Sequence, residues 1–269
     1  MSLRFEKLKS FSAVALTGGS SGIGYSLFKT LYTVNSSLRF CNISRSNPLP
    51  WAPDIALHHV SCDLSNRQSL ADAVPQIESI LSHDGGTGKI LLINNSGFGT
   101  YGAYPMPNLE QHLEMLEVNI RGPVALTGAL LPLLKKRGGA IVNVASTAAF
   151  QPTPYMGTYG ATKAFILNWS LALNQDLKPY NIPVLAVCPG VTTTRFFERA
   201  GFDGATPKPF VQTADAVAWE TLHALEKGRS LVVTGWHNKL LTTLSSIAPI
   251  RLRTAMAEIV LRKLRLEKK

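Results

Sequence analysis

Seven short runs of apolar and β-branched residues, separated by segments of helical length, constrain the fold more than any other feature of this sequence. The strands that they predict cover residues 13–17, 38–44, 56–61, 89–95, 140–146, 183–189 and 230–234. Strand and helix alternating in this way predict a parallel sheet with helices on both faces, the doubly wound α/β class. A chain of 269 residues suits one such sheet with a continuous core.

Capping signals mark where two of the intervening helices begin. Ser65 opens the capping box "SNRQ", which predicts a helix starting at that serine. Thr213 precedes "ADAVAWETLHALEKG" and predicts a helix that ends at Gly228. Longer helical segments are expected at 107–135 and 154–178.

The cysteines and the hydropathy of the sequence indicate in which cellular compartment the protein works. Cys41, Cys62 and Cys188 are odd in number and lie in apolar, strand-like runs, which is typical of reduced core residues. No apolar run reaches the roughly 18 residues of a membrane-spanning helix, and the N-terminus lacks the pattern of a cleavable signal peptide. A reducing, cytoplasmic location is therefore expected.

A glycine-rich turn, "TGGSSGIG" at 17–24, follows the first predicted strand. Backbone N–H groups at such a strand-to-helix turn can hold a pyrophosphate. We expect Gly18 to permit the tight turn, Gly22 the close approach of the phosphates and Gly24 the packing of helix on strand. The alternative is a loop that only closes a turn.

This stretch resembles the cofactor motif of the short-chain dehydrogenase/reductase family, and further motifs of that family follow in order. They are "NNSG" at 94–97, Asn119 in "VNIRGP", Ser146 in "VNVAS", Tyr159 and Lys163 in "YGATK", and "PGVTTT" at 189–194. In "NNSG", Ser96 stands where the family usually has alanine. The resemblance covers about residues 11 to 235. It implies a Rossmann domain at 1–237 with a lid segment at 195–212, and leaves a helical extension at 238–269.

The family's acid/base residue is a tyrosine, and helix geometry chooses between two candidates. Residues four apart share one face of a helix. Tyr159 has Lys163 at that spacing, whereas Tyr155 has Tyr159 there and no cation. A lysine so placed is expected to lower the pKa of the phenol, which makes Tyr159 the proton donor or acceptor.

The resemblance also implies roles for the other members of a catalytic tetrad. Ser146 would bond the substrate carbonyl oxygen, Lys163 would bond the nicotinamide ribose, and Asn119 would hold a water that links Lys163 to solvent. The cofactor contacts that we expect are Gly18, Ser20, Ser21, Gly22, Ile23, Gly24, Ser44, Arg45, Asp63, Leu64, Asn95, Ser96, Gly97, Tyr159, Lys163, Pro189, Gly190, Thr192 and Thr194.

The end of the second strand indicates which dinucleotide binds. An NAD site normally carries a carboxylate there, bonded to the ribose 2′-OH. Here the sequence reads "NISRS", with Ser44 and Arg45 and no acid. An arginine at this place can pair with a 2′-phosphate, so NADP(H) is expected in preference to NAD(H). Asp63 resembles the family residue that contacts the adenine ring, or it is a turn carboxylate that caps the helix that follows.

We therefore expect an NADP(H)-dependent oxidoreductase that interconverts a carbonyl and a secondary alcohol. Aromatic residues indicate an apolar substrate, or they serve only in packing; they are Phe98, Tyr101, Tyr104, Phe196, Phe197, Phe202 and Phe210. One alternative is a reductase of carrier-bound 3-ketoacyl groups, whose acidic carrier a basic surface would attract. Another is a regulator that binds NADP(H) without turnover. No metal is expected, because the histidines are scattered or, like His58 and His59, point to opposite faces of a strand.

The C-terminal extension carries most of the net charge. Residues 238–269 hold eight Lys or Arg and two Glu, a net +6 of the total +10. The segment breaks at Pro249, and beyond it one helical face is apolar (Leu252, Met256, Ile259, Val260) and another mostly basic (Arg251, Glu258, Arg262, Arg265, Lys269). Such a helix can lie on an anionic membrane, cover the sheet or cover a partner subunit; the sequence leaves these open.

Two further expectations concern partners. Nucleic-acid binding is not expected, because no basic patch with interleaved aromatic residues is present. The family resemblance implies a homo-oligomer, a dimer or a tetramer, that pairs through the long helices at 107–135 and 154–178.

Overall fold

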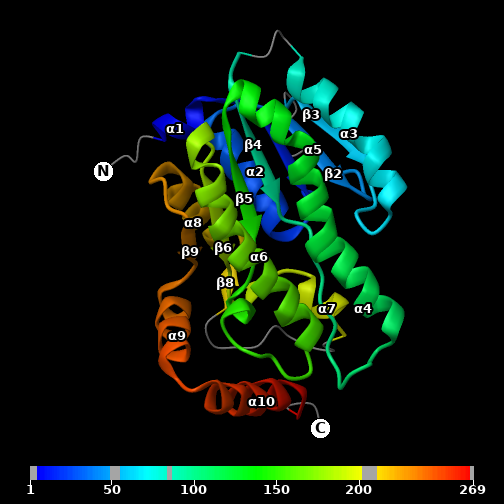
Figure 1. The fold of residues 1–269 in the computed structure, drawn as a ribbon, viewed down its shortest axis with the longest axis vertical. Coiled ribbons are helices and arrows are strands. Elements are labelled where there is room, and N and C mark those ends of the chain that lie inside the picture. The colour runs from blue at the N-terminus through cyan, green and yellow to red at the C-terminus, as the bar shows by residue number, and fades with distance from the viewer. Residues whose placement is uncertain (1–4, 49–54, 84–86, 202–210, 267–269) are drawn as a thin grey trace.

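A computed structural model describes residues 5–48, 55–83, 87–201 and 211–266, and its centre is a seven-stranded parallel sheet (Figure 1). The strand order is β3-β2-β1-β4-β5-β6-β9, with every neighbouring pair parallel. The strands are β1 (Phe11–Thr17), β2 (Arg39–Ser44), β3 (Leu57–Ser61), β4 (Lys89–Asn94), β5 (Gly139–Val144), β6 (Val184–Cys188) and β9 (Leu231–Val233). The predicted α/β class and all seven predicted strands are confirmed.

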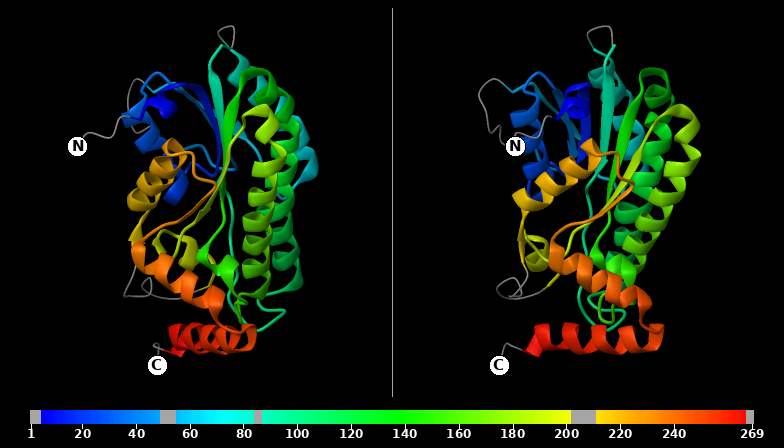
Figure 2. Two further views of the ribbon diagram at one scale, coloured as in Figure 1. Left: turned by 60° about the vertical axis from the view of Figure 1, so that its left-hand side comes forward. Right: turned by 90° about the vertical axis from the view of Figure 1, so that its left-hand side faces the viewer.

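Helices cover both faces of the sheet (Figure 2). The α-helices are α1 (Glu6–Lys9), α2 (Gly22–Val34), α3 (Arg67–Ser82), α4 (Leu109–Leu116), α5 (Gly122–Arg137), α6 (Gly157–Asp176), α7 (Phe196–Arg199), α8 (Ala214–Glu226), α9 (Trp236–Ile247) and α10 (Ile250–Leu266). The shorter elements are the π-helix η1 (Glu117–Arg121), the 3-10 turns η2 (Thr147–Phe150) and η3 (Lys178–Tyr180), and the strand pair β7 (Thr192–Thr193) and β8 (Gln212–Thr213).

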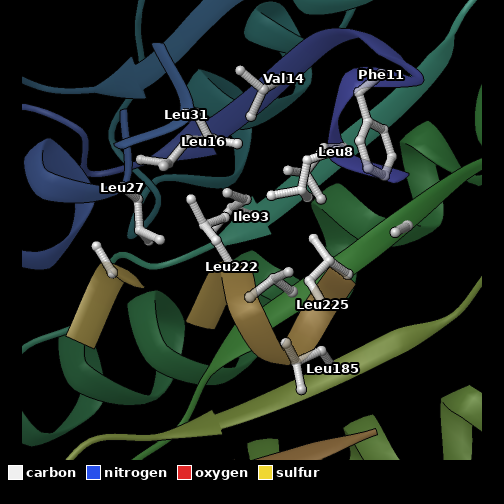
Figure 3. Close-up of a cluster of buried hydrophobic side chains, with 14 of the residues drawn as sticks. Leu8, Phe11, Val14, Leu16, Leu27, Leu31, Ile93, Leu185, Leu222 and Leu225 are labelled. Atoms are coloured by element: carbon white, nitrogen blue, oxygen red, sulfur yellow. The ribbon is translucent and has the colours of Figure 1, made fainter. Parts of the chain in front are cut away.

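The apolar core divides between the two faces, as strands buried on both sides require. On one face, residues of α2 and α8 pack on β1, β4 and β6, with Leu16, Leu27 and Leu222 at the centre (Figure 3). On the other, residues of α3 and α5 pack on the same sheet, with Ile77, Leu92 and Leu130 completely or almost completely buried. Burial of this kind gives about 1.5–3 kcal/mol for each large apolar side chain.

The capping predictions have different outcomes. Thr213 caps α8 as predicted, because its side chain accepts a hydrogen bond from the N–H of Ala216. The helix predicted to start at Ser65 starts two residues later, with Asn66 as its cap. Ser65 instead donates its N–H and hydroxyl to Asp63, and this turn holds the serine outside the helix.

The long helical segments are close to their predicted bounds. The segment predicted at 107–135 becomes α4, η1 and α5 in succession, which together run from Leu109 to Arg137. The segment predicted at 154–178 becomes α6. The helical extension breaks at Pro249 as predicted, between α9 and α10. In Figures 1 and 2, α10 lies across the end of the molecule toward which the strands point.

Candidate active site

The sequence motifs meet at the carboxyl edge of the sheet, because parallel strands end on the same side. The glycine loop follows β1, "NNSG" follows β4, Ser146 follows β5 and "PGVTTT" follows β6. Together they border a cavity of about 1100 Å³. Open α/β sheets bind ligands at this edge, where the strand order reverses between β1 and β4.

The glycines of the loop have the backbone geometry that a phosphate turn requires. Gly18 and Gly22 have φ angles of +73° and +57°, which disfavour any residue with a Cβ. A Cβ on Gly18 would lie 2.7 Å from the Ser96 hydroxyl, and one on Gly24 would lie 2.3 Å from the carbonyl oxygen of Gly18. Side chains at these positions would therefore fill or distort the loop.

The "NNSG" segment supports the glycine loop directly. The Thr17 hydroxyl accepts the N–H groups of Asn95 and Ser96, each at 3.0 Å. The side-chain amide of Asn95 donates in return to the carbonyls of Thr17 and Gly18, at 2.9 and 3.2 Å. Asn95 is thus placed beneath the loop as a support for its backbone.

A second support comes from Asn42 in β2, which our sequence reasoning missed. Its side-chain oxygen accepts the N–H of Gly19 at 2.8 Å, and its amide donates to the Ser44 hydroxyl at 2.8 Å and lies 3.0 Å from a ring nitrogen of His59. The signal was the polar residue in the otherwise apolar, buried run "FCNI". A buried amide in a strand needs partners of its own, and here they include the loop.

Nearly all the predicted site residues border the large cavity. The lining includes Gly18, Ser20, Ser21, Gly22, Ile23, Ser44, Arg45, Asp63, Leu64, Asn95, Ser96, Gly97, Ser146, Tyr159, Lys163, Pro189, Gly190, Thr192 and Thr194. Gly24 and Asn119 stand behind this surface. The structure thus brings nearly all the predicted residues together at one cavity.

At the end of the cavity beside β2, Arg45 is exposed and faces two acids. Its guanidinium lies 4.0 Å from a carboxylate oxygen of Asp63 and 3.8 Å from one of Glu114. Burial acts to raise the pKa of Asp63, but the hydrogen bonds from Ser65 and the charge of Arg45 hold it below its usual value. Asp63 therefore makes a turn with Ser65 and borders the cavity. It does not cap the following helix, because Asn66 holds that position.

A smaller hollow of about 440 Å³ adjoins the glycine loop. Its walls include Ser20 and Ser21 on one side, Ser46 and Asn47 after β2, and Arg195 and Arg199 at α7. Both arginines also border the large cavity. Sequence reasoning missed them, because they lie about 175 residues from the loop that they face.

The catalytic candidates come from three elements. Ser146 ends the loop after β5 and caps η2, with its hydroxyl accepting the N–H of Ala148. Tyr159 and Lys163 lie one turn apart on α6, and both are buried. The ammonium of Lys163 donates to the carbonyl of Val144 at 2.9 Å and lies 5.8 Å from the centre of the Tyr159 ring. The Ser146 hydroxyl hydrogen-bonds with the Tyr159 phenol.

Burial, rather than the lysine, sets the pKa values of this pair. It raises the pKa of Tyr159 to about 12, against the opposing effect of the hydrogen bond with Ser146. It also lowers the pKa of Lys163 to about 8. The predicted lowering of the Tyr159 pKa is therefore wrong for this structure, because the loss of hydration outweighs the attraction of the ammonium.

Asn119 lies in the π-helix η1, a rare element that often occurs at functional sites. Its side-chain oxygen accepts the N–H of Phe98 at 3.1 Å, and its amide donates to the Phe98 carbonyl at 2.9 Å and to the Thr162 hydroxyl at 3.0 Å. The residue thus ties the segment after β4 to α6. The predicted relay through a water molecule stays a prediction.

Aromatic side chains surround the phenol of Tyr159. Phe196 has its ring centre 5.1 Å from that of Tyr159 and 5.4 Å from that of Phe197. Phe98, Phe196 and Phe197 border the cavity as predicted for an apolar site. Tyr104 and Tyr101 are not in the lining. Tyr104 is 72% exposed, and Tyr101 donates its hydroxyl to the carbonyl of Leu261 at 2.8 Å. Phe202 and Phe210 lie outside the described residues.

The far wall of the cavity comes from the C-terminal helices, which sequence reasoning did not place at the site. Residues of α9 and α10 in the lining include Leu241, Leu244, Met256 and Val260. The amphipathic pattern of α10 was visible in the sequence, but its direction relative to the cavity was not. The lining is thus polar near the glycine loop and largely apolar beyond Tyr159.

Neither a cluster of metal ligands nor a membrane-spanning helix occurs in the described part of the chain. Among residues 5–48, 55–83, 87–201 and 211–266, no group of three His, Cys, Asp or Glu side chains could hold a metal ion. Within the same ranges, no helix is long and apolar enough to cross a bilayer.

The fold and the cavity define a class of protein. The glycine loop borders one part of the cavity, and the phenol of Tyr159, the hydroxyl of Ser146 and the ammonium of Lys163 border another. This donor set fits a dinucleotide, because the positive-φ glycines leave open the space that side chains would fill. The protein is a nicotinamide-dependent oxidoreductase.

Comparisons with known proteins give the family. The short chain dehydrogenase family matches residues 12–202, and the chain belongs to it. An uncharacterised oxidoreductase of Staphylococcus epidermidis is 31% identical over 216 residues, which cover 79% of this chain and 91% of that protein.

Solved structures agree with this assignment. A short-chain dehydrogenase of Sphingobium yanoikuyae in complex with NADPH has a TM-score of 0.71 and 26% identity, with 89% of this chain and 97% of that one covered. A 3-ketoacyl-(acyl-carrier-protein) reductase of Brucella melitensis complexed with NADH has a TM-score of 0.70, with 84% and 96% covered. Its 23% identity shows a shared fold alone.

Proposed function

We propose that this oxidoreductase interconverts a carbonyl and a secondary alcohol on an apolar substrate, with NADP(H) as its cofactor. The observation that carries the proposal is the position of Tyr159. Its buried phenol is bonded to the Ser146 hydroxyl and lies at the apolar end of a cavity that begins at the glycine loop.

Tyr159, Ser146 and Lys163 each have a separate role in the reduction. A bound nicotinamide supplies the hydride. Tyr159 donates its proton to the carbonyl oxygen, and the Ser146 hydroxyl donates a hydrogen bond that stabilises negative charge on that oxygen. Lys163 holds its ammonium behind the phenol, fixed by the carbonyl of Val144. The neutral phenol is the form that reduction needs, and burial favours it.

Substitution of the phenol tests this chemistry. We expect Tyr159→Phe to lower turnover by about 10²–10⁴-fold, because the proton donor is removed, and to leave NADPH affinity within about threefold. Stopped-flow oxidation of NADPH with ketones, aldehydes and 3-ketoacyl thioesters measures turnover. Fluorescence titration measures the affinity for NADPH. Tyr155→Phe, which removes the neighbouring hydroxyl outside the cavity lining, is the matched control. Wild-type protein that binds NADPH and turns over no substrate would favour the regulator.

The preference for NADP(H) is supported by cations near the end of β2. Arg45 borders the large cavity, and Arg195 and Arg199 face Ser20, Ser21 and Ser46 across the smaller hollow. A 2′-phosphate in this region would meet positive charge from two sides. We expect Arg45→Gln combined with Arg199→Gln to lower the ratio of NADPH to NADH efficiency by at least about tenfold. An unchanged ratio would show that neither arginine reads the phosphate.

Two further proposals concern the state of the protein. It forms a homo-oligomer through α4, α5 and α6, supported by exposed apolar side chains on these helices (Leu109, Leu113, Leu116, Val124 and Phe165). It works in a reducing, cytoplasmic compartment, supported by three buried free cysteines.

A further inference from the structure

The last two helices are amphipathic in the opposite sense from an ordinary surface helix. In α9, the polar residues Asn238 and Thr242 face the protein and are buried. The Asn238 amide donates to the Thr234 carbonyl at 2.8 Å and to Gln212 at 3.2 Å. The apolar residues Leu240 and Ile247 face outward, and Ile247 is 78% exposed. A helix that packs only on its own protein normally does the reverse.

The same inversion holds for α10. Its inner face is held by Arg253, which donates to the carbonyls of Phe150 and Ser245 at 3.1 and 3.3 Å, and by Ala257, which is buried. The apolar stripe that the sequence predicts for this helix is about half exposed, and two of its members, Met256 and Val260, also border the large cavity. The idea that this stripe covers the sheet is therefore wrong for the described structure.

The exposed apolar residues form one surface, which we call the tail face. Its members are Trp236, Leu240, Leu241, Leu244, Ile247, Ile250, Leu252, Met256, Ile259 and Val260, each between 49% and 78% exposed. They come from two consecutive helices at one end of the molecule (Figure 2). An apolar surface of this extent marks an interaction site.

The charge around the tail face indicates which kind of partner binds there. Arg251 and Arg262 are exposed on one flank of the stripe of α10, about three turns apart. The segment 238–269 carries a net +6. Apolar residues outward and basic residues on the flank are the pattern of helices that lie in the interface of an anionic bilayer.

We propose that the tail face docks the protein on an anionic lipid bilayer and that the substrate enters the cavity from the bilayer between α9 and α10. Four members of the tail face, Leu241, Leu244, Met256 and Val260, also border the large cavity. The docked surface and the apolar wall of the site are therefore continuous. The entry route rests on the proposed carbonyl chemistry, whereas the docking does not.

Vesicle binding tests the docking without any reference to activity. Wild-type protein should co-sediment with vesicles of phosphatidylcholine mixed with phosphatidylserine, less with phosphatidylcholine alone, and less again at high salt. The double variant Ile247→Glu with Ile259→Glu changes two exposed residues outside the cavity lining. It should weaken binding by about tenfold or more.

A matched control separates apolar contact from net charge. Ser36→Glu with Ser82→Glu makes the same change of charge at exposed positions on the opposite edge of the sheet, and it should retain most of the binding. Equal binding by wild type and the Ile247/Ile259 variant, or no binding by wild type, would overturn the proposal. A native mass that falls in that variant without lipid would show that the tail face joins two copies of the chain.

The entry route has its own readout. We expect the Ile247/Ile259 variant to reduce vesicle-dissolved dodecanal about tenfold more slowly than wild type and water-soluble butanal at an unchanged rate. Equal loss on both aldehydes, or no loss on dodecanal, would overturn the entry route. If wild type reduces neither aldehyde, the proposed carbonyl chemistry fails for them and the sedimentation result still decides the docking.

Discussion

At the level of single residues, burial shifts the pKa values of Tyr159 and Lys163 in opposite directions. Tyr159 and Lys163 lose hydration together, and each is driven toward its neutral form. A lysine on the same helical face thus acts here as a positioned ammonium with a pKa near 8. Its charge is available at neutral pH and disappears in mild alkali.

This shift predicts a pH dependence of stability. The pKa of Lys163 is about 8 in the folded state against 10.5 for the ordinary side chain. Between these values the unfolded chain binds more protons, so the free energy of unfolding rises with pH. Urea unfolding of wild type and Lys163→Met should show a difference that grows in favour of wild type by up to about 3 kcal/mol over this range. A constant difference would contradict the shifted pKa.

Gly24 gives a second residue-scale prediction. A Cβ at this position would lie 2.3 Å from the backbone oxygen of Gly18, and a backbone atom cannot move aside as a flexible side chain can. We expect Gly24→Ala to cost at least about 2 kcal/mol in urea unfolding and to weaken NADPH binding about tenfold. Gly128→Ala, with nothing within 4 Å of its Cβ, should instead stabilise α5 by about 0.5–1 kcal/mol.

At the scale of elements, the cofactor loop depends on strands that flank it. Asn42 in β2 bonds the N–H of Gly19, and this contact joins residues 23 positions apart. Asn42→Val keeps a residue suited to a strand but leaves that N–H without its partner. We expect a loss of about 1–3 kcal/mol in stability together with weaker NADPH binding by fluorescence titration. Wild-type affinity in a stable variant would show that the loop holds its shape alone.

At the scale of the whole molecule, two apolar surfaces remain exposed on the described chain, and each calls for a different partner. The surface of α4, α5 and α6 contains Leu113, Leu116 and Phe165 and belongs to the proposed oligomer. Leu113→Glu with Phe165→Glu should lower the native mass in light scattering, because charges would be buried in the contact. An unchanged mass with unchanged circular dichroism would place the oligomer contact elsewhere.

Much of this organisation was predictable from local patterns. The seven strands, the cap at Thr213 and the break at Pro249 follow from alternation, hydrogen-bonding side chains and the geometry of proline, which act over a few residues. The family motifs were also visible in order. The start of α3 was missed because Ser65 bonds Asp63, a competing local contact that a capping pattern does not reveal.

Patterns along the chain were enough to predict the fold class, the family and the residues that lie at the carboxyl edge of the sheet, because parallel strands bring every motif at a strand end to one edge. The tertiary structure alone decided which face of α9 and α10 points outward, which arginines face the glycine loop and how burial shifts Tyr159 and Lys163. These depend on which groups lose water when distant segments pack, and no pattern along the chain encodes that loss.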